Sequence, residues 1–323
     1  GGSDARQRAG PAAPDVEPKM SSTALATPRM RPAKKGLGGR GNTLPLVAPS
    51  VVLLLVFSLV PLAMTLWFSF RRYNLLNPAI HGFAGIANYK YLLLDPGLYQ
   101  SLLISVLLVG EVLILTICLG AVLAALFEHP FWGRGVARVL MIAPFFVMPT
   151  VSALIWKNLL MHPVNGLIAW ICRSLGLPVI DFFGNWPLSS IVIIVAWQWL
   201  PFAFLILLTA LQSLDESTLE AARLDGAGPI STFFYIQVPH MSRSITVVVM
   251  METIFLLGIF AEIYVTTSGG PGVATTNLTF LIYQRALLAF NVGSASAAGV
   301  IAIILANIMA AFLVRTVASR LDV

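Results

Sequence analysis

The sequence predicts an all-α integral membrane protein with six transmembrane helices. Of its 323 residues, 58% are hydrophobic and only 11% are charged, whereas soluble domains carry about 25% charged residues. The mean hydropathy is +0.86. A single soluble core could not bury this much apolar surface. The same composition excludes disordered, collagen-like and disulfide-stapled proteins.

Six apolar runs are long enough to cross the hydrocarbon core, which takes about 20 helical residues. The predicted spans are residues 44–70, 101–127, 136–156, 188–214, 244–266 and 294–314. The charged residues inside them are Glu111, Arg138, Glu252 and Glu262. These runs are apolar on every side, as lipid-facing helices are. Residues 44–323 are therefore expected to form one transmembrane domain.

The first 43 residues differ from the rest of the chain. Residues 1–43 hold eight Lys or Arg and three acidic residues, with many Gly, Pro, Ala and Ser. This composition predicts a disordered basic tail. With six spans and this tail inside, the inner segments carry 14 basic residues and the outer segments carry six. This excess predicts that both termini are cytoplasmic, and the tail supplies all of it, because without the tail the count is six against six.

No catalytic, metal-binding or nucleotide-binding pattern is present. Residues 36–43 have the glycine spacing of a phosphate-binding loop, but Asn42 stands where that loop needs a lysine. Cys118 and Cys172 have no metal-ligand spacing. The four histidines fall in predicted loops without ligand partners: His81, His129, His162 and His240. We therefore expect no enzymatic activity, no metal and no cofactor in this chain.

The loop after the fourth run predicts two short helices joined by a glycine turn. Asp215 or Ser217 can cap the first helix, and Gly226 and Gly228 end it. Small side chains in this stretch would let the backbone of another protein approach closely, although a plain amphipathic connector would have a similar pattern. The two predicted helices are residues 217–224 and 230–236.

The same loop resembles the EAA loop of permease subunits of bacterial ABC importers. The matching residues are Glu220, Ala221, Ala222, Asp225, Gly226, Ala227, Phe233, Ile236 and Pro239. The Asp-Gly-Ala form resembles the MalF- and UgpA-like carbohydrate branch. Stretches at 83–96 and 269–297 resemble its first and last external loops, so the likeness covers about residues 45–320. Val238 departs from the usual leucine, which is a mild apolar exchange.

The resemblance implies a type I ABC importer permease fold in the plasma (cytoplasmic) membrane. It implies a second permease subunit, two ATP-binding subunits that hold ATP and Mg, and an extracytoplasmic sugar-binding protein. Residues 215–240, called the coupling loop below, would dock on an ATPase. The docking contacts would be Glu220, Ala221, Ala222, Asp225, Gly226 and Ala227. A disaccharide such as trehalose or a maltose-like sugar is the implied substrate, with polyols and glycerol-phosphate compounds as alternatives.

The sugar site is expected near mid-membrane, on the two spans that flank the coupling loop. The candidate residues are Gln198, Trp199, Phe202, Glu252, Phe255, Leu256 and Ile259. Aromatic rings stack on sugars, and amides and carboxylates bond hydroxyls. Glu252 stands out because an acid at membrane depth is costly, although a packing role is the alternative. A stand-alone secondary transporter that uses the glutamates Glu111, Glu252 and Glu262 is the competing function.

Overall fold

The computed structural model describes residues 44–77, 79 and 82–321. The predicted tail, residues 1–43, therefore lies outside the described residues. The chain divides into two units, residues 1–55 and residues 56–323. The described part of the first unit is residues 44–55, the beginning of one helix. The remaining helices and strands described below belong to the second unit.

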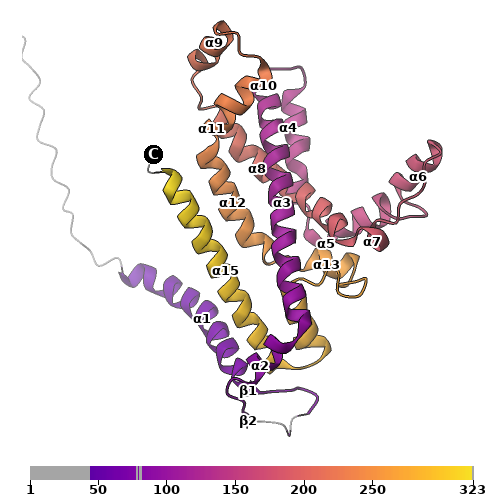
Figure 1. Cartoon of the computed structure of the whole chain (residues 1–323). Helices are drawn as coiled ribbons and strands as arrows, with labels where there is room; N and C mark the ends of the chain where they lie inside the picture. The colour runs from indigo at the N-terminus through magenta and orange to yellow at the C-terminus, as the bar shows by residue number, and fades with distance from the viewer. Residues whose placement is uncertain (1–43, 78, 80–81, 322–323) are drawn as a thin grey trace, which may run out of the picture. The chain divides into compact units, whose positions relative to one another are not determined.

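Four helices of the described chain are long and apolar enough to cross a membrane. They confirm helices at the first, second, fourth and sixth predicted spans. Their bounds are α1 (Leu44–Ser69), α3 (Pro96–Glu128), α8 (Pro187–Leu211) and α15 (Val292–Leu321). Of these, α3 and α8 lie side by side (Figure 1).

Local sequence signals explain where two of these helices begin. Pro96 is the first residue of α3, and Pro187 is the first residue of α8. A proline suits this position, because the first-turn N–H groups have no helical partner and the ring fixes a helical φ. The Asp95 carboxylate caps α3 by accepting a hydrogen bond from the backbone N–H of Gly97 over 2.9 Å.

Short elements connect the long helices. β1 (Arg71–Arg72) and β2 (Gly82–Phe83) form an antiparallel pair in which Arg71 lies opposite Phe83. The short helices outside the coupling loop and the two interrupted spans are α2 (Ala87–Leu94), α6 (Leu167–Ser174), α7 (Phe182–Asn185), α14 (Leu278–Tyr283) and the π-helix η4 (Gln284–Leu288).

The third predicted span, 136–156, is wrong as a single helix. Its residues belong to two helical segments, Arg134–Phe146 and Pro149–Leu160, which meet at an angle of 101°. Between them Met148 is extended, with a ψ angle of 138°. Pro149 explains the bend, because a proline disfavours helical backbone at the residue before it. The segments comprise α4 (Arg134–Ile142), η1 (Ala143–Phe146), α5 (Pro149–Leu154) and η2 (Ile155–Leu160).

The fifth predicted span, 244–266, is also interrupted. Side chains at the start of α14 bind the backbone carbonyls at the interruption. Thr279 Oγ1 donates to the Leu257 carbonyl over 2.9 Å. Asn277 Nδ2 donates to the Ile259 carbonyl over 2.6 Å. The two resulting helices are α12 (Ser242–Leu256) and α13 (Ala261–Thr266).

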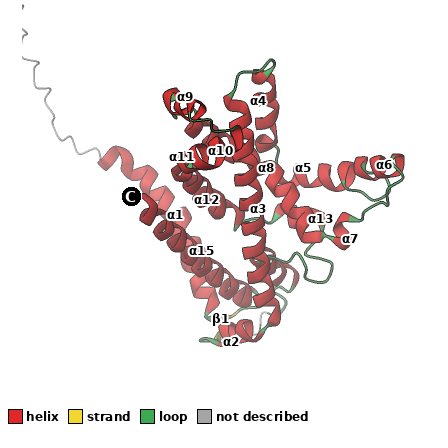
Figure 2. Ribbon diagram, turned by 45° about the horizontal axis from the view of Figure 1, so that its top comes forward, coloured by secondary structure: helices red, strands yellow, loops and turns green. Residues whose placement is uncertain are grey.

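These two interruptions change the number of candidate spans. The described chain has four helices that could cross a membrane, or five if the bent pair counts as one span, where six were expected. Figure 2 shows that helices and loops make up nearly all of the described chain. The all-α membrane class is therefore confirmed, while two of the predicted spans are broken.

The core lies where α3 and α8 pack against each other. A side chain added at Gly120 would stand 3.2 Å from the Ala203 Cβ atom, so glycine permits the close approach. A buried cluster beside this contact reaches the first residues after the coupling loop. Its members are Ala121, Ala124, Phe127, Phe204, Leu207, Leu208, Leu211 and Met241. The core thus holds the two helices on which the coupling loop rests.

Candidate functional site

The coupling loop contains the two predicted helical segments and the turn between them. Asp215 stands at the N-cap position of the first helix, although its side chain makes no capping hydrogen bond. Figure 1 shows α9 and α10 together at one end of α3 and α4. The segments are α9 (Glu216–Leu224), α10 (Pro229–Thr232), the π-helix η3 (Phe233–Gln237) and α11 (Val238–His240).

Gly226 makes the turn that ends α9. Its φ angle is +80°, in the left-handed region that glycine adopts without strain. The Ala227 N–H donates to the Ala222 carbonyl over 2.9 Å, and the Gly226 N–H donates to the Arg223 carbonyl over 3.1 Å. This pair of bonds is a Schellman motif. A Cβ atom added at Gly226 would have no other atom within 4 Å, so the backbone angle, and not space, requires glycine.

The predicted docking residues lie mainly on the outside of the loop. Glu220, Ala221, Asp225 and Gly226 are exposed, Ala227 is half-buried, and Ala222 is buried. Large apolar side chains are uncovered beside them: Leu224, Ile230, Phe234 and Tyr235. Leu224 alone is 89% exposed. Exposed apolar side chains gathered among polar ones are typical of a surface that contacts another protein or a membrane.

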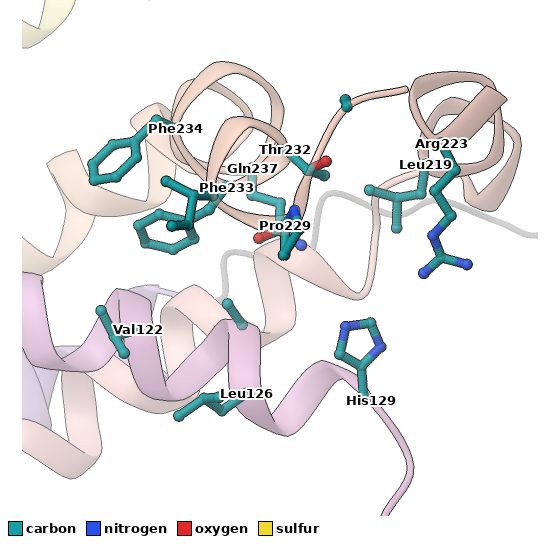
Figure 3. Close-up of a pocket in the computed structure, with 13 residues that line it drawn as sticks. Val122, Leu126, His129, Leu219, Arg223, Pro229, Thr232, Phe233, Phe234 and Gln237 are labelled. Carbon is teal, nitrogen blue, oxygen red and sulfur yellow. The ribbon is translucent and has the colours of Figure 1, made fainter. Parts of the chain in front are cut away.

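A groove of about 430 Å³ separates part of the coupling loop from the last turns of α3. Leu219 and Arg223, four residues apart on α9, line it, and Figure 3 shows both directed toward His129 at the end of α3. Glu220 lies on a different face of α9 and is not among the lining residues. The lining is Val122, Ala125, Leu126, His129, Leu219, Arg223, Ala227, Pro229, Ile230, Thr232, Phe233, Phe234 and Gln237.

Two side-chain contacts that the sequence did not predict hold the loop to the helices. Gln237 Nε2 donates to Glu128 Oε2, at the end of α3, over 2.6 Å. His240 Nε2 lies 3.2 Å from Ser213 Oγ and 3.1 Å from the Ala210 carbonyl, at the end of α8. The sequence predicts His240 as a solvated loop residue, because nothing in the spacing shows that the loop folds back on α8.

The structure places three predicted sugar-site residues around an aromatic group. The Trp199 ring lies 5.2 Å from the Phe255 ring and 6.1 Å from the Phe202 ring, centroid to centroid. Phe145, which the sequence did not single out, joins them 5.7 Å from Trp199. All four are partly or largely exposed. The bend before Pro149 brings Phe145 there, so linear spacing could not reveal it.

Gln198 occupies the buried side of this aromatic group. Its Nε2 donates to the Val147 carbonyl over 2.7 Å, at the bend between η1 and α5. Its Oε1 is buried and has no hydrogen-bond partner among the described residues. Gln198 therefore fastens the bent segment to α8 and keeps one acceptor unused.

The remaining predicted sugar-site residues are buried in the helix bundle. Glu252 is fully buried, and its Oε2 accepts a hydrogen bond from Thr116 Oγ1 over 2.7 Å. Its Oε1 has no partner among the described residues. Leu256 and Ile259 belong to the apolar core. In this conformation, Trp199, Phe202 and Phe255 are accessible, whereas Glu252, Leu256 and Ile259 lie behind them.

The described residues contain no group of three or more His, Cys, Asp or Glu side chains arranged to hold a metal ion. Glu252 pairs with Thr116, and Gln198 bonds the Val147 carbonyl.

Comparison with known proteins places this geometry in a family. Residues 116–323 match the family model described as "Binding-protein-dependent transport system inner membrane component". A solved "bacterial ABC transporter involved in the import of the acidic polysaccharide alginate" has the same fold, with a TM-score of 0.73 at 19% identity. That likeness covers 86% of this chain and 96% of the solved chain.

Two relatives match over most of their length. The trehalose/maltose transport system permease protein MalF of Thermococcus litoralis is 32% identical over 254 residues, which are 77% of this chain and 85% of the relative. The sn-glycerol-3-phosphate transport system permease protein UgpA of Agrobacterium fabrum is 29% identical over 279 residues, which are 85% of this chain and 94% of the relative. As the coupling-loop motif predicts, this chain belongs to the family of binding-protein-dependent transport system inner membrane components, of the MalF- and UgpA-like kind.

Proposed function

We propose that this chain is one of two permease subunits of an ATP-driven sugar importer. Together with the second permease it forms the membrane path for a sugar that an extracytoplasmic binding protein delivers. The observation that carries this proposal is the coupling loop, which exposes Glu220, Leu224 and Asp225 and is fastened to α3 and α8 on its other side.

Membership of the family defines part of this role directly. The chain is a multi-pass inner-membrane permease subunit and is not itself an enzyme. The family carries no cofactor of its own in this subunit. ATP and Mg would therefore be bound by the partner ATPases.

In the proposed complex, two ATP-binding subunits dock from the cytoplasm, one of them on the coupling loop. Glu220 and Asp225 supply polar contacts at the rim, and Leu224 supplies an apolar contact that is otherwise left in water. Ala221, Gly226 and Ala227 allow a close backbone approach. Ala222 supports the docking face from inside, because its side chain is buried.

The proposed topology places the coupling loop, both termini and the basic tail, residues 1–43, in the cytoplasm. The bent pair α4–α5 would make the third crossing, and α12 with α13 would make the fifth. The excess of basic residues on the inner side supports this orientation. Six crossings follow if each interrupted segment passes the whole bilayer.

The proposed sugar site is the aromatic group around Trp199, with Phe145, Phe202 and Phe255. Aromatic faces of this kind suit the apolar faces of a disaccharide such as trehalose or a maltose-like sugar. Gln198 Oε1 and Glu252 Oε1 are unused acceptors, and they would receive sugar hydroxyls when the helices separate. Leu256 and Ile259 would line the path in that opened state.

Glycerol-phosphate compounds are the second candidate substrate, because UgpA relatives share 29% identity with this chain. A phosphate would need free cations in the path. Lys157, however, donates to the Val265 carbonyl over 2.9 Å, and Arg285 pairs with Asp95. The engagement of these two cations favours the neutral disaccharide. A stand-alone secondary transporter is disfavoured by the family assignment.

The decisive experiment isolates the complex through a tag on this chain and reconstitutes it with its binding protein. We expect two ATPase copies and a second permease to co-purify. ATP hydrolysis should rise with trehalose or maltose more than with glycerol 3-phosphate or a polyol. Transport by the purified chain alone would contradict the proposal, and stimulation by glycerol 3-phosphate only would replace the sugar with the second candidate.

A further inference from the structure

One hydrogen bond connects the coupling loop to a helix that is not its neighbour along the chain. Gln237, in η3, donates from Nε2 to Glu128 Oε2 over 2.6 Å, across 109 residues of sequence. Gln237 is buried, with an exposed fraction of 6%. An amide that donates to a carboxylate makes a charge-assisted bond, which is stronger than a bond between neutral groups.

The Gln237–Glu128 bond lies where the coupling loop meets α3, a helix to which the loop is not directly joined along the chain. The coupling loop is covalently joined to α8 and α12, so those two helices move with it directly. By contrast, α3 ends at Glu128 and receives the loop's movement only through non-covalent contacts. The groove separates α9 and α10 from Val122 and Leu126 of α3 (Figure 3). On that side, α9 and α10 face α3 across the groove.

Apolar packing also links the loop to α3, because Phe233 packs against the buried cluster that includes Ala124 and Phe127 of α3. Such contacts resist compression, but they are not directional and let surfaces slide. A buried polar bond has a fixed donor and acceptor geometry. The Gln237–Glu128 bond is therefore the contact that can pull α3 as well as push it.

We propose that Gln237 and Glu128 are positioning residues that transmit the movement of the coupling loop to α3. This inference rests on the proposed function as an ATP-driven importer. When a docked ATPase displaces the loop, the bond carries the end of α3 with it. Because α3 also packs closely against α8 at Gly120, the bond adds to the movement that α8 transmits and applies it at the end of α3, and the path opens or closes.

The test breaks the bond at either end and then rebuilds it in reverse. The single variants are Gln237→Ala and Glu128→Ala. The double variant combines Glu128→Gln with Gln237→Glu, which keeps one amide donor and one carboxylate acceptor. Thr232→Ala is the matched control, because Thr232 lies in the same coupling loop and its side chain bonds to the nearby Gly228 carbonyl, over 3.1 Å.

The measurement is the amount of sugar transported per ATP hydrolysed by the complete complex in proteoliposomes. Assembly is checked by co-purification of the partner subunits. We expect both single variants to assemble and to lose at least about fivefold in this ratio, the lower end of typical coupling between sites. The double variant should recover most of the loss, and Thr232→Ala should match the wild type.

Several results would overturn the inference while leaving the importer function intact. Assembled single variants with a wild-type ratio would show that α3 follows the loop without this bond. A double variant that remains uncoupled would show that the bond itself is not what matters. Single variants that fail to assemble, with the double variant restoring assembly, would make the bond a folding contact only. If the wild-type complex hydrolyses ATP without transporting sugar, the proposed function is contradicted, and the inference falls with it.

Discussion

At the residue scale, two buried polar side chains of the candidate sugar site, Glu252 and Gln198, each have one atom that is hydrogen-bonded and one that is not. Glu252 bonds Thr116 with one carboxylate oxygen and leaves the other unpaired. Gln198 bonds the Val147 carbonyl with its amide nitrogen and leaves its oxygen unpaired. An unsatisfied buried polar atom costs free energy that a purely structural position would avoid. In the proposed sugar site, these two oxygens would accept hydrogen bonds from the ligand.

The substitution Glu252→Leu tests this interpretation. We expect normal complex yield, because a mid-membrane acid costs roughly 2.5–3.5 kcal/mol on insertion scales and leucine does not. Sugar-stimulated ATP hydrolysis at limiting sugar should fall by up to about tenfold, since a hydrogen bond is worth about 0.5–1.5 kcal/mol.

Thr116→Val is the matched control for Glu252→Leu. It removes the donor that holds Glu252 and leaves the carboxylate in place, so stimulation should change much less. Reduced yield with normal stimulation per complex in Glu252→Leu would assign Glu252 to helix packing. Unchanged yield and stimulation together would remove it from the sugar site.

Gly226 gives a second prediction at this scale. Gly226→Val should leave the chain in the membrane but abolish transport, because a β-branched residue is strained at a φ angle of +80°. Left-handed backbone costs a non-glycine residue about 1–2 kcal/mol. Gly226→Asn should retain much of the activity, since asparagine tolerates this region better.

Gly228→Ala is the control for Gly226→Val. Gly228 lies two residues away with a φ angle of −73°, and nothing lies within 4 Å of an added side chain there. Alanine should therefore be accepted. Pull-down of the ATPase and uptake of sugar are measured together. Normal uptake with valine at position 226 would contradict the docking role of the turn.

At the scale of elements, broken helices depend on side chains from elsewhere in the chain. The break between α12 and α13 is supported by Asn277 and Thr279 at the start of α14. The bend before α5 is supported by Gln198 of α8. Apolar composition alone predicts a continuous span in both places. Pro149 is a local signal for the bend before α5, whereas the break between α12 and α13 could not be predicted because the side chains that support it lie 18 and 22 residues away in sequence.

Asn277 provides a test of this dependence. It donates to the Ile259 carbonyl and also caps α14 by accepting from the Phe280 N–H over 2.8 Å. Asn277→Ala should lower the unfolding free energy by about 1–3 kcal/mol, because it leaves buried backbone groups without partners. Asn277→Asp keeps the capping acceptor and removes only the donor, so it should retain the cap but not the support at Ile259.

The measurement for Asn277 is the thermal unfolding midpoint of the purified complex. Ser174→Ala serves as a control, because Ser174 is exposed and bonds only to the Trp170 carbonyl one turn earlier. Equal midpoints for wild type and Asn277→Ala would show that the break between α12 and α13 is stable without this side chain.

At the scale of the whole molecule, sequence reasoning identified the class, the family and the coupling loop. Long apolar runs predict straight spans such as α3 and α8, because composition and length decide them locally. The turn at Gly226 was predictable because it too is local. The contacts Gln237–Glu128 and Trp199–Phe145 were not, because each depends on how separate helices pack. What remains to be measured at this scale is the number of crossings.

The bent pair α4–α5 makes that number testable. If the pair crosses the bilayer, Trp132 before it and Leu177 after it lie on opposite sides. If the pair enters and leaves by the same face, they lie on the same side. Trp132 is fully exposed and Leu177 is 55% exposed, so a cysteine at either position would be accessible.

We expect six crossings, with Trp132 inside and Leu177 outside. Cys118 and Cys172 are first replaced by serine, and Trp132→Cys and Leu177→Cys are then made separately. A membrane-impermeant maleimide added to intact cells or spheroplasts should label only Leu177→Cys, and permeabilisation should expose Trp132→Cys. Ser217→Cys, on the coupling loop, should behave like Trp132→Cys because ATPases dock from the cytoplasm. Labelling of Trp132→Cys and Leu177→Cys from the same side would show that the bent pair does not cross the bilayer. The coupling loop would then lie on the opposite side of the membrane from the one proposed.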